Sequence, residues 1–372
     1  KFTNERRIGA VNLRIPGPIP VPDDILDAMS GPMINHRGPE FKEILYRVTE
    51  GLKKIFETKN DVYILTSSGT GAMEAAIVNT LSPGDKVLNA TVGIFGNRFG
   101  EIARRYGAEV IDLTFPFGYA VELDQIRETL KKHRDVKAVM ITHNETSTGV
   151  TNDLKSITRS VKDEFNKLVL VDGISSVCSI PLSTDDWGCD VIATASQKGW
   201  MLPPGLAFVS FSDSAWEAYK TARMPKFYFD VGMYKRYYEI GQPPYTPSIS
   251  TVLALDIALK RLMAEGMGSV YERHANIGEM TRQGVKDMGL TILPKDDVAS
   301  NTVTAVNIPE GVDGNLLIKI MREDHGVVLA GGQQALNGKI FRIGHMGYCT
   351  EEEMKDVFDA LSSTLNGLEF AV

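Results

Sequence analysis

The first residue whose setting suggests chemistry is Lys198, in the run Ser196-Gln197-Lys198-Gly199. An apolar and glycine-rich stretch, Trp200–Gly205, follows it. Desolvation disfavours an ammonium and lowers its pKa, which is what an amine that attacks a carbonyl carbon needs. Taken alone, a lysine after a strand lies more often on the surface, so both interpretations stay open.

An acidic residue, Asp172, closes the apolar run Leu168–Val171 and precedes Gly173-Ile174-Ser175-Ser176. Ligands of open α/β sheets bind beyond the carboxyl ends of the strands. A carboxylate there can keep the ring nitrogen of a pyridoxal cofactor protonated. Lys198 follows the next predicted strand, Val191–Ala193, so both side chains could reach one site. The alternative is a helix N-cap or an ordinary loop aspartate.

A third candidate feature is the run Thr66–Gly71, between a predicted strand and a predicted helix that begins near Ala72. Its hydroxyls and glycines, at Ser68, Gly69 and Thr70, suit a helix N-terminus whose N–H groups point at an anion. No lysine follows the last glycine and no GxGxxG spacing occurs, so it is neither a Walker A loop nor a dinucleotide fingerprint. The run predicts a phosphate cup, and a plain capped turn would use similar residues.

The elements that would position these side chains are short apolar strands alternating with amphipathic helical segments. Such a pattern is typical of a mostly parallel sheet covered by helices on both faces. We therefore predict an α/β fold with a large domain over residues 15–250. Its seven expected strands are Asp61–Leu65, Lys86–Ala90, Glu109–Leu113, Val136–Thr142, Leu168–Val171, Val191–Ala193 and Leu206–Phe211.

The remainder of the chain has a different pattern of predicted helices and strands. A helical pattern over Ser250–Glu265 carries one apolar stripe and is expected to link two domains. Residues 251–372 are predicted to form this linker and a smaller α+β domain, and residues 1–14 an N-terminal extension. The expected elements of the smaller domain are strands at Thr302–Ile308, Gly326–Ala330 and Ile340–Ile343 and helices over Asn315–Glu323 and from Glu351.

Composition excludes several classes of protein. The formal net charge of −7 argues against a nucleic-acid partner, because phosphate binding needs a basic footprint. Apolar runs are too short for a membrane span. The three cysteines form no CxxC pair, and no signal peptide is visible at Lys1, so we expect a cytoplasmic protein. The six histidines show no HxxxH spacing, and we predict no metal.

In combination, these motifs resemble the class V aminotransferases, and more narrowly the alanine–glyoxylate and serine–pyruvate branch. The resemblance covers nearly the whole chain. It implies the fold type I of pyridoxal-phosphate-dependent transferases, pyridoxal 5′-phosphate as cofactor, and a homodimer. The matching segments are Pro16–Pro20, His36–Phe41, Ser68–Ala76, Asn144–Gly149, Val171–Ser176 and Ser196–Lys198.

The resemblance also implies roles for single residues. Lys198 would hold the cofactor as a Schiff base and move the proton between substrate Cα and cofactor C4′. Asp172 would pair with the pyridinium nitrogen, with Ile174 on one ring face and Phe95 on the other, although a lone phenylalanine is usually core. The phenolic oxygen would lie near Thr146. The residues expected to hold the phosphate are Ser68, Gly69, Thr70 and Gln197.

Four more residues complete the expected site. Arg342 lies in an alternating strand-like run and on that pattern alone would face solvent, but the resemblance implies that it binds the substrate carboxylate. Gly17 is expected at the substrate. Thr246 matches a threonine that reaches the phosphate from the neighbouring subunit. Some relatives have a tyrosine where Pro243 stands here, which leaves Tyr245 as an alternative hydroxyl.

The expected activity is therefore amino transfer from alanine or serine to glyoxylate or pyruvate by a ping-pong route. A cysteine desulfurase-like lyase would need a cysteine on the loop before Arg342, and Gly331–Lys339 contains none. A non-catalytic accessory subunit of the same fold, of the hydrogenase-associated type, is the other alternative. We interpret Gly331–Gln334 as a mobile loop at the substrate mouth and His143 as a hydrogen-bonded strand-end histidine.

Overall fold

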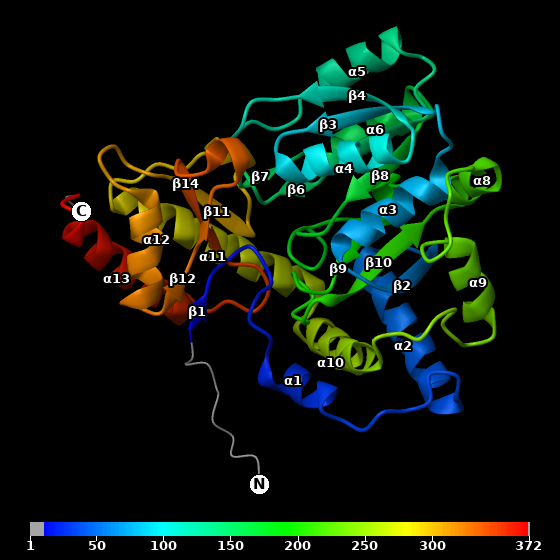
Figure 1. The fold of residues 1–372 in the computed structure, drawn as a ribbon, viewed down its shortest axis with the longest axis horizontal. Helices are drawn as coiled ribbons and strands as arrows, with labels where there is room; N and C mark the ends of the chain where they lie inside the picture. Colours follow the sequence, from blue (N-terminus) through cyan, green and yellow to red (C-terminus); the bar gives the residue numbers. More distant parts are fainter. Residues whose placement is uncertain (1–10, 371–372) are drawn as a thin grey trace.

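A seven-stranded sheet dominates the computed structural model, which describes residues 11–370 (Figure 1). Its order is β2-β10-β9-β8-β5-β3-β4. Only β10 runs antiparallel to its neighbours, so the predicted mostly parallel sheet is confirmed. All seven predicted strands join it: β2 (Asp61–Ser67), β3 (Lys86–Thr91), β4 (Glu109–Thr114), β5 (Ala138–Thr142), β8 (Leu168–Asp172), β9 (Val191–Ala195) and β10 (Gly205–Phe211).

Helices cover both faces of this sheet, and successive strand residues pack into different cores. In β5, Val139 and Ile141 belong to one core, while Ala138 and Met140 belong to the other. Strands buried on both faces read as continuous apolar runs, which explains the pattern in the sequence. The first core holds α1 (Asp23–Met29), α2 (Pro39–Phe56), α5 (Leu123–Lys132), α6 (Leu154–Asp163) and α10 (Ile249–Glu265), and the second α3 (Gly69–Thr80), α4 (Ile94–Arg105), α8 (Asp213–Thr221) and α9 (Val231–Glu239).

A smaller α+β part lies beside the large sheet (Figure 1). Its antiparallel sheet has the order β11-β14-β13, with α11, α12 and α13 packed around one further core. None of the helices within residues 11–370 is long and apolar enough to cross a lipid bilayer. The elements are β11 (Val303–Asn307), β13 (Ala330–Gly331), β14 (Ile340–Gly344), α11 (Met267–Asp287), α12 (Gly314–Glu323) and α13 (Glu351–Gly367).

One predicted strand is wrong. The run Gly326–Ala330 divides into β12 (Val327–Val328) and β13, because the two halves pair with different partners. β12 pairs in parallel with β1 (Asn12–Leu13), near the start of the chain, whereas β13 pairs with β14. Of the predicted N-terminal extension, residues 1–10, including Lys1, lie outside the described residues.

Gly266 separates the expected linker helix, α10, from a second helix, α11. α10 ends at Glu265 as expected, but α11 begins at once with Met267. Gly266 has a φ of +80°, a left-handed conformation that favours glycine. α10 packs on α1 and α2, and α11 packs on α13 and β11, so this glycine lies where the chain passes from one core to another. The division of the chain near residue 250 stays a prediction.

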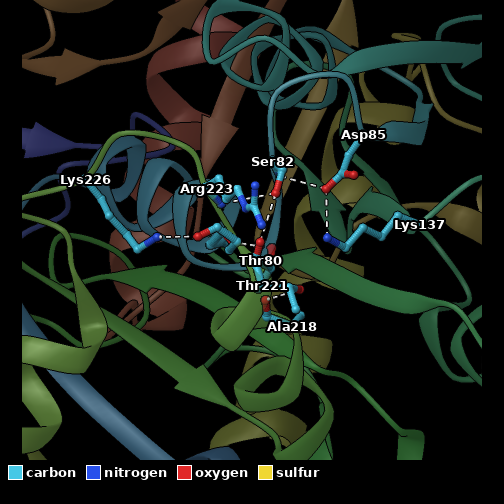
Figure 2. A network of polar contacts seen from close by, with 10 residues as sticks. Thr80, Ser82, Asp85, Lys137, Ala218, Thr221, Arg223 and Lys226 are labelled. Carbon is cyan, nitrogen blue, oxygen red and sulfur yellow. Dashed lines mark hydrogen bonds and ion pairs between the residues drawn. The ribbon is translucent and has the colours of Figure 1, made fainter.

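A polar network joins the amino end of β3 to the last turn of α8 and the segment that follows it (Figure 2). The Asp85 carboxylate accepts the Ser82 N–H at 2.7 Å and the Lys137 ammonium at 2.8 Å. The Ser82 hydroxyl donates to the Thr221 carbonyl at 3.2 Å and accepts the Arg223 N–H at 3.1 Å. These contacts lie at the amino ends of the parallel strands, away from the carboxyl edge of the sheet.

Candidate active site

A cavity of about 360 Å³ opens at the carboxyl ends of β8 and β9 and at the N-terminus of α3. This is where open α/β sheets bind ligands, and the volume is in the range of small-molecule pockets. Most of the predicted site residues line it: Gly17, Ser68, Gly69, Thr70, Phe95, Thr146, Asp172, Ile174, Gln197 and Lys198. The other lining residues are Met73, Arg98, Asn144, Ser175 and Gln333.

Lys198 is buried, with 9% of its surface exposed, so the surface interpretation is wrong. Its Nζ donates a hydrogen bond to the Pro16 carbonyl. Burial, with the positive charge of Arg342, lowers the pKa of Lys198 to about 8, and Asp172 opposes this shift. Gly17 has a φ of +120°, and a Cβ there would lie 2.6 Å from Nζ, so only glycine fits beside the amine.

Asp172 is the last residue of β8 and is 3% exposed, not a loop aspartate. Its Oδ1 accepts the Ile174 N–H at 3.0 Å, and its Oδ2 lies 3.5 Å from the Thr142 hydroxyl. Burial raises the pKa of Asp172 to about 7, and the nearby Glu145 adds to the rise. A buried acid with spare lone pairs facing a cavity is suited to hold a cationic N–H group.

The N-terminus of α3 has hydrogen-bond donors that could bind an anion. Ser68 occupies the N-cap position, but its hydroxyl makes no capping hydrogen bond, and the first N–H groups of a helix lack intrahelical partners. A Cβ at Gly69 would lie 2.6 Å from Ile174 Cδ1, so a larger residue there would push the Ile174 side chain from its present position. Gln197 Oε1 is buried without a partner among residues 11–370, and its amide could donate in the flipped orientation. These groups fit a phosphate.

Apolar surface reaches the cavity from two elements. Ile174 follows β8, and Phe95 lies in the first turn of α4. The guanidinium of Arg98 stands 5.0 Å from the centre of the Phe95 ring. A planar aromatic ligand can gain dispersion and stacking energy from such surfaces.

Arg342 lies in the middle of β14 and is 5% exposed, so the solvent-facing interpretation is wrong. Its Nε and Nη2 donate to the Gly331 carbonyl at 3.1 and 2.8 Å, and Nη1 donates to the Thr146 carbonyl at 3.1 Å. A guanidinium has five N–H donors, so these bonds leave one on each Nη. That pair forms a fork that matches a carboxylate. Arg342 itself is not among the residues that line the cavity.

Two predicted residues, Tyr245 and Thr246, do not line the cavity of this chain. The Tyr245 hydroxyl donates to the Phe227 carbonyl at 3.0 Å, and its ring stacks on Tyr228 at 5.1 Å between centroids. The hydroxyl is therefore occupied within its own chain, and the structure does not bring it to the cup.

One residue of the cavity wall, Asn144, could not be singled out from the sequence. Asn144 belongs to one of the matching segments but had no expected role of its own, and its side chain donates to Ser175 at 2.8 Å and to Thr302 at 2.9 Å. It thereby joins the large sheet to the smaller part at the cavity wall. Gln333 lines the cavity, as expected for a loop at the substrate mouth. His143 is buried outside the cavity, and its Nδ1 has no partner among residues 11–370, so the hydrogen-bonded interpretation fails for that atom.

This chain is similar in sequence to aminotransferases and to proteins named as hydrogenase subunits. Residues 26–357 match the family described as aminotransferase class-V. A soluble hydrogenase small subunit of a Synechococcus strain is 42% identical, covering 96% of this chain and 94% of that protein. The L-aspartate–glyoxylate aminotransferase of Paracoccus denitrificans is 39% identical, covering 91% and 86%.

Solved structures agree with this result. The crystal structure of an alanine–glyoxylate aminotransferase from Nostoc sp. superposes with a TM-score of 0.93 at 31% identity and covers 97% of each chain. The cavity of the present chain combines a shielded lysine, a strand-end carboxylate and a phosphate cup, which are the groups that pyridoxal phosphate requires. The chain belongs to the class V aminotransferases and is a transaminase that depends on pyridoxal phosphate.

Proposed function

We propose that the protein moves the amino group of a small amino acid, alanine or serine, to a small 2-oxo acid, glyoxylate or pyruvate, in two half-reactions. The observation that carries this proposal is the convergence of Lys198, Asp172 and the α3 N-terminus on one cavity. Arg342 stands beside it with two unused donors. Named relatives that act on glyoxylate support this choice of acceptor.

The cofactor has a place for each of its groups. Asp172 would pair with the ring nitrogen, Ile174 and Phe95 would contact the two ring faces, and Thr146 would lie near the phenolic oxygen. When bound, pyridoxal phosphate supplies an electron sink for the Cα of the amino acid and carries the amino group between substrates. The phosphate would be held by Ser68, Gly69, Thr70 and Gln197.

Lys198 would act as anchor and as proton carrier. Its pKa, lowered to about 8, leaves a substantial fraction of neutral amine at physiological pH. The neutral Nζ can accept the proton from the substrate Cα and return it in the opposite half-reaction. The Pro16 carbonyl and the close backbone of Gly17 hold this amine within the cavity wall.

Arg342 would bind the substrate carboxylate. Every 2-amino acid and 2-oxo acid carries this group, so one fork serves both half-reactions. Its three bonds to the Gly331 and Thr146 carbonyls fix the guanidinium before substrate arrives. Preorganised donors lose little entropy on binding.

The active form would be a homodimer with shared sites. Thr246 lies outside the cavity of its own chain and would reach the phosphate of the neighbouring subunit. Phe227 is 78% exposed and Tyr228 38%, and such aromatic surface is enriched at protein interfaces. Both rings pack around Tyr245, one residue from Thr246.

The cellular location would be the cytoplasm. All three cysteines, Cys178, Cys189 and Cys349, are buried free thiols. Unpaired thiols are typical of a reducing compartment. Fractionation of the source cells would test this assignment, and recovery in an oxidising compartment would contradict it.

The spectrum of the purified protein with bound cofactor tests the activity. We expect its visible absorbance to fall when alanine or serine is added alone and to return when glyoxylate or pyruvate is added alone. A panel of donors and acceptors would rank the substrates. A protein that cannot be reconstituted with pyridoxal phosphate would instead support the accessory-subunit alternative, which the intact Lys198, Asp172 and Arg342 do not favour.

A further inference from the structure

Glu145, the second residue of β6 (Asn144–Glu145), is fully buried and accepts four hydrogen bonds. Its Oε1 accepts the N–H of Ser147 at 3.0 Å and the hydroxyl of the same residue at 2.6 Å. Its Oε2 accepts the N–H groups of Phe95 and Gly96, both at 3.0 Å. Those two groups belong to the first turn of α4, where N–H groups have no partner within the helix.

The cap on α4 therefore comes from a distant part of the chain. The Ser147 hydroxyl also accepts the Ile94 N–H at 3.0 Å, so Glu145 and Ser147 together bind the first three N–H groups of the helix. The residue at the N-cap position itself is Gly93, which has no side chain to contribute. A Cβ at Gly93 would lie 2.5 Å from Glu145 Cγ, so the glycine makes room for the glutamate.

This arrangement is costly compared with a local cap. A serine at the N-cap position could cap the same helix with a neutral hydroxyl, without burying a charge. Burial raises the pKa of Glu145, and hydrogen bonds from Ser147, Gly96 and Phe95 oppose the rise. The distant carboxylate also fixes the backbone position of Phe95, whose ring lines the cavity.

We propose that Glu145 is a positioning residue for the cofactor, which acts by holding Phe95 in place against the cofactor ring. The inference rests on the proposed function, because it assumes that Phe95 contacts that ring. Glu145 itself does not line the cavity. Its effect on the site would pass through two main-chain N–H groups at the start of α4.

An electrostatic route is the competing explanation. The charge of Glu145 adds to the rise that burial causes in the pKa of Asp172, and it opposes the lowering that burial causes in the pKa of Arg342. Glu145→Gln and Glu145→Met separate the two routes. The glutamine has no charge and can turn its oxygen to the α4 N–H groups and its NH₂ to the Ser147 hydroxyl, so it keeps the cap on α4 and loses only the hydrogen bond from the Ser147 N–H. The methionine fills similar space but cannot replace the carboxylate as an acceptor for the α4 N–H groups or for Ser147.

The experiment measures the dissociation constant of pyridoxal phosphate from the apoprotein and the circular dichroism of the bound cofactor. We expect E145M to weaken binding about tenfold and to reduce the dichroic band, and E145Q to weaken binding less than about threefold. In the F95A background, E145M should change binding less than about twofold, because the ring that it positions is gone.

Three outcomes would overturn the inference or its premise, and they are distinguishable. Equal weakening by E145M with and without Phe95 would show that Glu145 does not act through the ring. Equal weakening by E145Q and E145M would assign the effect to charge. If F95A alone binds as tightly as the parent protein, the proposed place of Phe95 fails, and the inference fails with it.

Folding is controlled separately. Asp190 is another buried carboxylate, which accepts the Val169 N–H and the Ser212 hydroxyl, both at 2.8 Å, outside the cavity. We expect D190N to lower the melting temperature and leave cofactor affinity unchanged; E145M behaving in this way would overturn the proposal. If E145M does not fold, Gly93→Ala displaces Glu145 directly and should weaken binding only when Phe95 is present.

Discussion

At the scale of single residues, the assignment of Lys198 as anchor and base gives the most direct test. We expect Lys198→Ala to lower kcat/KM at least about 10³-fold, because one side chain is proposed for both roles. Lys226→Ala is the matched control, since Lys226 also has a pKa lowered by burial but lies outside the cavity. A K198A protein that retained most of its activity, or both variants losing it equally, would contradict the assignment.

The pKa of Lys198 also predicts how the apoprotein takes up its cofactor. Only the neutral amine attacks the aldehyde, and with a pKa of about 8 its fraction rises through neutral pH. The rate of appearance of visible absorbance should therefore increase from about pH 6 to about pH 8 and then level off. Stopped-flow mixing across this range measures it. A rate that kept rising about tenfold per pH unit beyond pH 9 would show an ordinary lysine pKa.

Asp172 is expected to lower the stability of the apoprotein at neutral and higher pH, although the bound cofactor needs its charge. Its folded-state pKa of about 7 exceeds the unfolded value of about 3.9, so the folded apoprotein binds a proton that the unfolded chain releases. Stability from this group is greatest at low pH and falls as pH rises from about 4 to about 7. Asp172→Asn removes the buried charge and should stabilise the apoprotein at about pH 8 by roughly 1–2 kcal/mol.

The same substitution should lower the transfer rate, because an amide cannot supply the negative charge that the ring nitrogen needs. Thermal unfolding of the apoprotein at low and high pH, beside steady-state rates, gives both quantities. Loss of stability at high pH in D172N would show that Asp172 is charged and well compensated in the empty cavity.

At the scale of elements, side chains that cap the first turn of a helix contribute to the stability of the fold. α13 begins with a capping box, in which the Thr350 hydroxyl accepts the Glu353 N–H at 3.2 Å and the Glu353 carboxylate accepts the Thr350 N–H at 2.8 Å. Thr350→Ala should lower the free energy of unfolding by about 1 kcal/mol. Thr350→Ser keeps the hydroxyl and should stay near the parent value.

This helix lies in the smaller part of the molecule, away from the cavity lining. Cofactor affinity should therefore be unchanged in both variants. Denaturant unfolding of the two variants measures the stability, and an equal loss in T350A and T350S would assign the effect to the methyl packing instead of the cap.

At the scale of the whole molecule, shared sites in a homodimer predict complementation. Lys198→Ala and Thr246→Ala should each impair their own homodimers. In mixed dimers, one of the two sites contains Lys198 from one subunit and Thr246 from the other. Random reassociation should therefore recover about a quarter of the parent activity, because half of the dimers are mixed and each has one complete site.

The control for this test is the same mixture prepared without dissociation and reassociation, which should stay at the low level of the single variants. Light scattering gives the mass of the mixture. No recovery in mixed dimers of confirmed composition would show that Thr246 serves its own subunit or no site.

Much of the large sheet could be predicted because its strands are defined by local composition. All seven were placed. Five of them, β3, β5, β8, β9 and β10, are buried along almost their whole length and therefore read as continuous apolar runs. The edge strand β4 has only exposed and half-buried residues, so its β-branched residues were its signal. Asp172 and Lys198 could be assigned to one edge because they follow two of the apolar runs. The smaller part was harder: Gly326–Ala330 reads as one strand, and only its pairing with Asn12–Leu13 and with β14 divides it.

The fold class, the family and the order of the chemical groups along the chain could be predicted from residue types and their spacing alone. Which of those groups share a cavity, and which partners hold them, depends on how the folded chain packs. Glu145 illustrates the difference, because its hydrogen bonds reach α4 across some 50 positions. Arg342 is similar: alternation predicts a solvent-facing side chain, and burial against Gly331 and Thr146 reverses that. Contacts between distant segments depend on packing, which local patterns of residue type do not encode.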